Sequence, residues 1–224
     1  MKKIYIIGSS SNIAKSLDQS LDNDFDTIFF GRTNPHHLKN FITYNGIHNQ
    51  DSVDELGQTI IDDLNSSSGL ESASLVVLAG VSSKNWTESF LVNEYLPAKL
   101  SEMFCETVAS LGLQGNSVTL VGSSAAYQGA KLPYATTKAS LSGILHTISR
   151  DYRNTARINI ILPSAFESGM IADWNEEKRR DVASSNHIGR LGTADDMADA
   201  IVFTVKNGFI TNSTINMTGG TVHV

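Results

Sequence analysis

A chain of 224 residues is long enough for one α/β domain and short for two. Its hydrophobic fraction of 41% and charged fraction of 18% are those of an ordinary folded protein and exclude a disordered one. The formal net charge of -6 gives no electrostatic reason to expect a nucleic-acid partner, and no run approaches the ~18 apolar residues that would span a bilayer. We therefore expect one cytoplasmic domain over residues 1–224, with no nucleic-acid and no membrane partner.

Seven short apolar runs alternate with helical periodicity along the whole chain. They are Ile4–Ile7, Thr27–Phe30, Phe41–Tyr44, Leu75–Leu78, Val118–Val121, Arg157–Leu162 and Thr214–Met217. Most are continuously apolar, which is typical of parallel strands that helices cover on both faces. The alternation predicts an α/β fold, namely a Rossmann-like, doubly wound, parallel seven-stranded sheet with helices on both faces. Such sheets bind ligands at the carboxyl ends of their strands.

Amphipathic helices are predicted between these strands. Ser52 and Glu55 have the spacing of a capping box ahead of one helix, and Thr193 with Asp196 opens a later one. The apolar pattern of Leu91–Leu111 predicts a single long helix, which offers an apolar face for self-association. The histidines show no metal-ligand spacing with acids or cysteine, so no metal is expected.

The first predicted strand runs into Gly8, three serines and then Asn12-Ile13-Ala14, where a helix begins. A glycine at this turn lets the backbone approach a pyrophosphate, and the helix start offers free N–H groups. The Gly-x-Gly-x-x-Gly fingerprint is absent. Either a phosphate loop or a serine-capped helix start without a ligand fits these residues.

The spacing Tyr-x-x-x-Lys occurs three times, at Tyr95/Lys99, Tyr127/Lys131 and Tyr134/Lys138. The first pair brackets a proline and the second a glycine, whereas the third begins an uninterrupted helical pattern. The third pair also follows a strand that ends in Gly122-Ser123-Ser124. This context predicts that Ser124, Tyr134 and Lys138 converge at the ligand edge of the sheet.

Those three side chains suit hydride chemistry on a carbonyl. A free tyrosine has a pKa near 10, and a lysine ammonium one helical turn away favours the tyrosinate. A serine hydroxyl holds the carbonyl oxygen beside the phenol.

Further motifs occur in the order found in one known family. They are Leu78-Ala79-Gly80, Val92-Asn93-Glu94, Asn159-x-x-x-Pro163-Ser164, Arg190-Leu191-Gly192 and Thr218-Gly219-Gly220. With the glycine loop and the Ser/Tyr/Lys set, this order resembles the short-chain dehydrogenase/reductase family over essentially the whole chain. The chain departs from the family's pattern at Asn12 and Ala14, which replace glycines, and in a serine–tyrosine spacing of only ten residues.

The resemblance implies an oxidoreductase whose catalytic residues are Asn93, Ser124, Tyr134 and Lys138. It also implies a cofactor site formed by Gly8, Ser9, Ser11, Asn12, Ile13, Arg32, Thr33, Ile47, Ala79, Gly80, Tyr134, Lys138, Pro163, Phe166 and Ser168. A homotetramer or homodimer is expected on the same ground.

The second strand ends Phe29-Phe30-Gly31-Arg32-Thr33, with no acid after Asp26 to accept a ribose 2′-hydroxyl. The Arg32 guanidinium can instead pair with a 2′-phosphate, which predicts NADP(H) over NAD(H). A strand-end arginine that points into solvent is the alternative.

Three functions fit these observations. The first is a carbonyl reductase or alcohol dehydrogenase acting on a small-molecule substrate. The second is a catalytically quiet NADP-binding regulator, suggested by the altered glycine loop. The third is a nucleotide-sugar-modifying relative, although such proteins carry a larger C-terminal substrate domain than the residues after Leu162 supply. Trp174 lies where the family has its substrate lid, and is either a lid anchor or a surface aromatic. Acyl thioesters, sugar-derived ketones and secondary metabolites all remain open as substrates.

Overall fold

The computed structural model of the chain describes residues 1–21 and 25–222. Its centre is a seven-stranded sheet of order β3-β2-β1-β4-β5-β6-β7, in which every neighbouring pair is parallel. The strands are β1 (Lys2–Ile7), β2 (Phe25–Gly31), β3 (Phe41–Thr43), β4 (Ser72–Val77), β5 (Asn116–Val121), β6 (Ala156–Pro163) and β7 (Ser213–Met217). The seven predicted strands and the fold class are confirmed, with strand ends shifted by a few residues.

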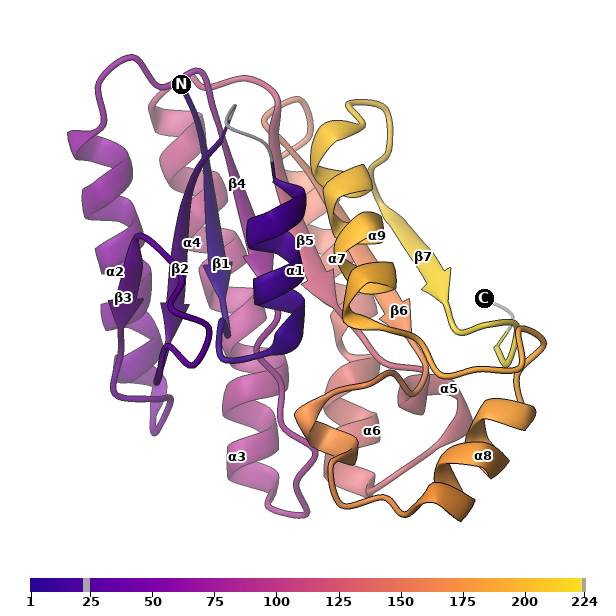
Figure 1. The fold of residues 1–224 in the computed structure, drawn as a ribbon. Helices are drawn as coiled ribbons and strands as arrows, with labels where there is room; N and C mark the ends of the chain where they lie inside the picture. The colour runs from indigo at the N-terminus through magenta and orange to yellow at the C-terminus, as the bar shows by residue number, and fades with distance from the viewer. Residues whose placement is uncertain (22–24, 223–224) are drawn as a thin grey trace.

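The strand order fixes where a ligand site can form. From β1 the chain adds β2 and β3 on one side, and then returns to place β4 through β7 on the other. The crossover connections that follow β1 and β4 therefore diverge, which leaves a crevice at their carboxyl ends. In Figure 1 all the strand arrows point toward this lower edge of the sheet.

Helices cover both faces of the sheet (Figure 1). One apolar core lies beneath α1 (Asn12–Ser20) and α9 (Ala194–Lys206). The other lies beneath α2 (Gln50–Ser66), α4 (Leu96–Ser110) and α7 (Leu141–Asp151). The remaining helices lie toward the carboxyl edge, namely α3 (Trp86–Phe90), α5 (Ala125–Gln128), α6 (Leu132–Ala139) and α8 (Glu176–Ser184).

The start of α2 differs from the prediction. Its cap is Asn49, whose side-chain oxygen accepts the Ser52 N–H at 2.9 Å, while the Ser52 hydroxyl accepts the Asn49 N–H at 3.2 Å. Ser52 is therefore the third residue of the helix and not its cap, so the predicted Ser52/Glu55 box is wrong. The later capping box, Thr193 with Asp196, is confirmed.

The predicted long helix over 91–111 is interrupted and begins earlier. A run from Trp86 contains α3, then a π-helical turn at Leu91–Tyr95, and then α4. Pro97 lacks an N–H and its ring would clash with the carbonyl four residues back in a regular helix. The wider turn, in which the Leu96 N–H bonds the Leu91 carbonyl, relieves this conflict.

The uninterrupted helical pattern predicted from Tyr134 onward is also divided into two helices. The first, α6, ends at Ala139, and the second, α7, begins at Leu141.

The apolar residues of α4 pack inside the chain. Leu96, Leu100, Phe104 and Val108 are all at most 1% exposed and belong to the core beneath α2, α4 and α7. This face is therefore not available for the self-complementary contact that the sequence suggests. Across the described ranges, no helix combines the length and apolar character needed to cross a membrane.

Candidate active site

A large cleft opens at the carboxyl edge of the sheet, where the loops after β1, β2, β4, β5 and β6 meet. Its volume is about 1180 Å³. One half is lined by the loop that follows β1, and the other by the segment between β6 and α9. The first is called the nucleotide half below and the second the substrate half.

The turn after β1 requires glycine. Gly8 has φ +96°, and a Cβ built there would lie 2.6 Å from the Ala79 backbone nitrogen. The Gly8 N–H donates to the Phe30 carbonyl at 2.9 Å, which pins the turn between β2 and β4. The backbone is therefore tightly packed at the switch point, as a loop that approaches a pyrophosphate must be.

Two predicted cofactor residues do not line the cleft. Ser9 is fully buried, its hydroxyl donates to the Ile6 carbonyl at 2.8 Å, and its N–H donates to Phe30, so neither group is free for a ligand. Thr33 pairs with Ser10, whose hydroxyl lies 3.0 Å from the Thr33 carbonyl oxygen. Ser10 lines the cleft in place of Ser9, a difference that residue types alone do not reveal.

Ser11 carries an unpaired polar atom at the start of α1. It occupies the cap position, but its hydroxyl makes no cap bond and is buried without a partner. The hydroxyl lies among cleft-lining residues at a helix N-terminus, where phosphate oxygens are favoured. The remaining predicted members of this half also line the cleft, namely Asn12, Ile13, Arg32, Ile47, Ala79, Gly80 and Pro163.

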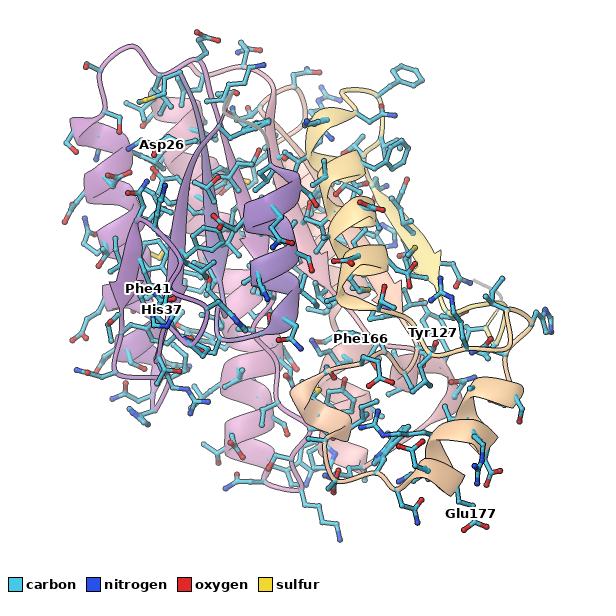
Figure 2. The ribbon with its side chains drawn as sticks, in the orientation of Figure 1. Asp26, His37, Phe41, Tyr127, Phe166 and Glu177 are labelled. Carbon is cyan, nitrogen blue, oxygen red and sulfur yellow. The ribbon has the colours of Figure 1, made fainter. Side chains whose placement is uncertain are left out.

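Arg32 lies at the end of β2 with its side chain exposed. Among residues 1–21 and 25–222 it forms no hydrogen bond or ion pair, although its charge opposes the rise that burial gives to the pKa of Tyr44. Asp26 pairs across the sheet with Lys3 at the other end of the same strand. Figure 2 places Asp26 at the amino-terminal edge, away from the cleft.

Only one of the three tyrosine–lysine pairs lines the cleft within the described chain. Tyr95 packs on Phe90, and Lys99 pairs with Glu102 at 3.3 Å. Tyr127 is 53% exposed, and Lys131 donates to the Ser82 carbonyl. The remaining pair, Tyr134 and Lys138, lies in the cleft wall.

Lys138 is buried, and a hydrogen bond fixes the position of its ammonium group. Its ammonium donates to the Val121 carbonyl at 2.7 Å, at the end of β5. Burial lowers its pKa to about 8. A Cβ at Gly80 would come within 3.3 Å of the lysine nitrogen, so the glycine after β4 leaves room for the ammonium.

Burial has the largest influence on the pKa of Tyr134. Burial raises the pKa of Tyr134, and a hydrogen bond with the Ser123 side chain acts in the opposite direction. The lysine ammonium is directed to the Val121 carbonyl. Ser123, which is not among the predicted site residues, lines the cleft as well.

Ser124 lines the cleft beside Ser123. Its backbone N–H donates to the Pro163 carbonyl at 2.8 Å, and its carbonyl accepts the N–H groups of Tyr127 and Gln128. Its hydroxyl makes no hydrogen bond within the described residues, which leaves it free to bind a ligand.

Asn93 lies behind the cleft wall and not in it. Its side chain accepts the Val81 N–H at 2.8 Å and donates to the Val81 carbonyl at 2.9 Å and to the Thr137 hydroxyl at 3.3 Å. It is fully buried in the π-helical turn. Asn93 therefore ties the loop after β4 to α6, and positions the helix that carries Tyr134 and Lys138.

The segment of residues 164–192, called the lid below, lies beyond the carboxyl edge of the sheet in Figure 1, and several of its residues line the cleft. Arg179 organises it by donating to the Glu167 carboxylate at 2.5 Å, to the Ile171 carbonyl at 2.8 Å and to the Trp174 carbonyl at 3.2 Å. Trp174 lines the cleft, and so do Phe166 and Ser168. The structure thus places Trp174 in the lid wall, beneath the Lys178 ammonium that lies 4.4 Å from its ring centroid.

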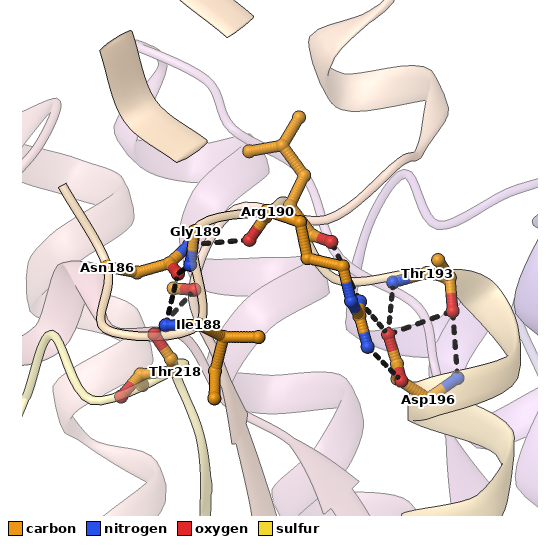
Figure 3. Close-up of polar contacts among 9 residues, drawn as sticks. Asn186, Ile188, Gly189, Arg190, Thr193, Asp196 and Thr218 are labelled. Atoms are coloured by element: carbon orange, nitrogen blue, oxygen red, sulfur yellow. Dashed lines mark hydrogen bonds and ion pairs between the residues drawn. The ribbon is translucent and has the colours of Figure 1, made fainter. Parts of the chain in front are cut away.

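The far end of the lid is fixed by the network drawn in Figure 3. Arg190 binds both oxygens of Asp196, at 2.6 and 2.9 Å, and this pairing holds the pKa of Asp196 far below its usual range. Asn186 closes the preceding turn by donating to the Arg190 carbonyl at 2.6 Å. The lid is therefore anchored to the first turn of α9, which packs on the sheet.

The two halves together fit a bound dinucleotide with a reacting carbonyl beside it. An orphaned buried hydroxyl at Ser11, a close-packed Gly8 turn and an unpaired Arg32 match pyrophosphate and ribose groups. Tyr134, Lys138 and two serines supply proton transfer and carbonyl binding. Across the described residues, no cluster of three or more His, Cys, Asp or Glu side chains could hold a metal ion.

Comparisons with known proteins identify the family of the chain. A family model described as Enoyl-(Acyl carrier protein) reductase matches residues 52–222. The chain is 30% identical to Tropinone reductase-like 3 of Erythroxylum coca over 130 residues, or 55% of this chain and 50% of that protein. It is 27% identical to the 3-oxoacyl-(acyl-carrier-protein) reductase FabG of Escherichia coli (strain K12) over 95 residues, or 41% of this chain and 39% of that protein. The matches thus span half the length of these curated relatives or less.

Solved structures share the fold at low sequence identity. The ligand-free aldohexose dehydrogenase of Thermoplasma acidophilum superposes with a TM-score of 0.84 at 20% identity, covering 98% of this chain and 93% of that one. ElxO with NADP bound gives a TM-score of 0.82 at 19% identity, covering 98% of both chains.

The fold and the cleft define a dinucleotide-binding oxidoreductase of the Rossmann type. The chain belongs to the short-chain dehydrogenase/reductase family, whose members are NAD(P)-dependent.

Proposed function

We propose that this chain is an NADPH-dependent reductase of ketones, which in the reverse direction oxidises secondary alcohols. The observation that carries the proposal is that Tyr134, Lys138 and the Ser123-Ser124 pair share one cleft with the Gly8 loop. The bound nicotinamide would supply the hydride. The chain would supply binding, orientation and the proton.

Tyr134 is the group suited to give the proton. Hydride addition to a ketone leaves a developing alkoxide, and a phenol within the cleft can protonate it. Burial raises the pKa of Tyr134, so its hydroxyl stays protonated near neutrality and favours reduction. The Lys138 ammonium, held in the same wall, stabilises the negative charge that the tyrosine acquires after the transfer.

Ser124 is the group suited to hold the carbonyl oxygen. Its hydroxyl has no partner among the described residues, and its backbone is fixed by the Pro163 carbonyl. A donor that is already oriented costs little reorganisation when negative charge develops on the oxygen.

NADPH is favoured over NADH because of the end of β2. Arg32 has a free guanidinium at the edge of the nucleotide half, whereas Asp26 lies at the opposite end of its strand. A guanidinium fork pairs well with a phosphate, and no carboxylate stands there to repel it.

A panel of ketones tests the proposal by following the loss of NADPH absorbance. Glu88 lines the cleft, so the panel includes neutral and cationic ketones as well as anionic ones. Turnover in wild type that disappears in Tyr134→Phe is the expected result. NADPH binding without turnover of any ketone in the panel would instead support the catalytically quiet regulator.

The assembly is a separate proposal, because the apolar face of α4 is used inside the chain. We propose a homodimer or homotetramer on the family resemblance alone. Light scattering at micromolar concentration tests it, and a monomeric mass would contradict it.

A further inference from the structure

Gln128 is the last residue of α5, and it lines the cleft. Its backbone N–H donates to the Ser124 carbonyl at 2.9 Å, which closes one helical turn between the two residues. Side chains four residues apart in a helix lie on the same face, with their Cβ atoms about 5–6 Å from each other. Ser124 also lines the cleft, so the Gln128 side chain lies one turn away from the hydroxyl proposed to hold the carbonyl oxygen.

The hydrogen bond of the Gln128 amide determines which of its two polar atoms is free. The amide nitrogen, Nε2, donates to the Thr221 carbonyl at 3.1 Å. A carbonyl oxygen can only accept, so the nitrogen must face Thr221 and the amide oxygen, Oε1, must face away from it. Oε1 has no hydrogen-bond partner within residues 1–21 and 25–222. Gln128 therefore contributes an unpaired hydrogen-bond acceptor to the wall of the cleft.

The turn that binds this amide is itself held from several sides. The Thr221 hydroxyl donates to the Thr218 carbonyl at 3.1 Å, and Thr218 is fully buried. At the start of the lid, the Ser164 hydroxyl donates to the same Thr218 carbonyl at 3.1 Å. Toward the end of the lid, the His187 N–H donates to the Gly219 carbonyl at 2.7 Å. Because the turn is fixed, the amide is oriented before a substrate binds, which lowers the cost of using its oxygen.

The charged groups of the cleft wall bear on the kind of substrate that fits it. Among the described residues of this wall, the Lys and Arg side chains are Arg32 and Lys138. Arg32 belongs to the nucleotide half, and the Lys138 ammonium donates to the Val121 carbonyl at 2.7 Å. Glu88 also lines the cleft, and its carboxylate forms no ion pair within the described residues. An anionic substrate therefore lacks a cation to pair with, whereas a substrate that carries hydrogen-bond donors meets unpaired acceptors.

We propose that Gln128 is a specificity-determining residue whose Oε1 accepts a hydrogen bond from a hydroxyl group of the substrate, so that the protein prefers hydroxyketones to acyl thioesters and to unsubstituted ketones. This inference rests on the proposed reductase function. The hydroxyl lies about one helical turn from the Ser124 hydroxyl, because that is the separation of the two side chains on α5. The hydrogen bond forms with the substrate and persists in the transition state, so it lowers KM and leaves kcat unchanged.

Matched ketones test the inference. Acetoin is compared with butanone, and diacetone alcohol with methyl isobutyl ketone, because the members of each pair differ by one hydroxyl. In wild type, kcat/KM for the hydroxyketone of at least one pair is about 3- to 10-fold the higher, the equivalent of one neutral hydrogen bond. In Gln128→Met, which keeps the length of the side chain and lacks the amide, this preference disappears while kcat/KM for the unsubstituted ketone stays close to that of wild type.

The matched control is Tyr127→Phe, since Tyr127 is the neighbour of Gln128 on α5 and does not line the cleft. It keeps the wild-type preference. If Gln128 only supported the fold, Gln128→Met would lower kcat/KM for both members of a pair by the same factor. A preference that survives in Gln128→Met, or that is absent from wild type, would overturn the inference.

Binding measurements separate this inference from the proposed function. Each ketone is titrated into the NADPH complex of Tyr134→Phe, with and without Gln128→Met, and the change in NADPH fluorescence reports its affinity. A preference for the hydroxyketone that Gln128→Met removes, in a protein whose wild type reduces no ketone, would refute the proposed function and leave the role of Gln128 standing. Turnover of both members of each pair at equal kcat/KM would refute the role of Gln128 and leave the reductase standing.

Discussion

The two halves of the cleft are built differently. The nucleotide half consists of short turns whose backbone groups bond directly to the sheet, as where Gly8 donates to Phe30 and a Cβ would strike Ala79. The substrate half is covered by the lid, whose shape depends on the side chains of Arg179 and Arg190.

This difference in construction matches the different tasks of the two halves, namely binding the dinucleotide and binding the substrate. The dinucleotide is the same molecule whatever the substrate, so backbone geometry that a few residue types enforce can bind it. A lid held by side-chain contacts can change its lining without disturbing the sheet. The predictions below test whether the two halves are as independent as this comparison implies.

The largest effect is expected at the catalytic tyrosine. Tyr134→Phe removes only the hydroxyl that supplies the proton, so kcat falls at least ~10²-fold. NADPH affinity, measured by fluorescence titration, stays close to that of wild type because the nucleotide half is untouched.

The matched control is Tyr127→Phe, since Tyr127 has the same spacing to a lysine but is 53% exposed and lines no part of this cleft. It leaves kcat unchanged. A silent Tyr134→Phe beside a damaging Tyr127→Phe would show that the wrong pair has been identified.

A second prediction concerns the buried lysine. Burial lowers the pKa of Lys138 from 10.5 to about 8. Between these values the unfolded chain holds a proton that the folded chain has lost, so the folded state gains stability as pH rises through this window. Relative to Lys138→Met, which cannot titrate, the free energy of unfolding of wild type should rise by about 3 kcal/mol from pH 8 to 10.5.

Denaturant unfolding at several pH values measures this difference. The rate of ketone reduction should fall over the same pH range in which the free energy of unfolding rises, because Lys138 loses its charge above pH 8. If the wild-type and Lys138→Met stabilities kept a constant difference across the window, the lysine would be protonated throughout.

Much of the nucleotide half could be predicted from the sequence, because its signals are local. Gly8 ends an apolar strand, Arg32 ends the next, and each lies beside the cleft. The prediction that Ser9 lines the site was not met because its hydroxyl donates to the Ile6 carbonyl, an orientation that residue type alone does not fix. The π-helical turn around Asn93 arises from a conflict at Pro97, which periodicity does not register.

The set of predicted catalytic residues that line the cleft could be derived from the sequence only in part. The helical spacing of Tyr134 and Lys138 is a local signal, and both line the cleft. Two adjacent serines end β5, and the sequence does not show that Ser123 lines the cleft as well as Ser124. The lid contacts of Arg179 join residues whose pairing no sequence period encodes.

The third prediction tests the nucleotide half alone. Arg32→Ala should weaken NADPH binding about 10- to 150-fold, the value of a charge-assisted contact of roughly 1.5–3 kcal/mol, and leave NADH binding unchanged. Lys39→Ala is the control, because Lys39 is an exposed cation of the same connection that does not line the cleft. Equal affinities of wild type for the two reduced cofactors would refute the proposed preference.

The smallest effect is expected at the lid. Arg179→Ala removes the contacts to Glu167, Ile171 and Trp174, and a partly exposed ion pair of this kind contributes up to about 1 kcal/mol. We therefore expect KM for the ketone to rise about 2- to 5-fold while kcat and NADPH affinity change less, and amide exchange to quicken in residues 167–184. Arg180→Ala is the matched control, since Arg180 is the exposed neighbour on the same helix. An Arg179→Ala effect on NADPH affinity as large as that on KM would show that the two halves are coupled, and the independence drawn from their construction would fail.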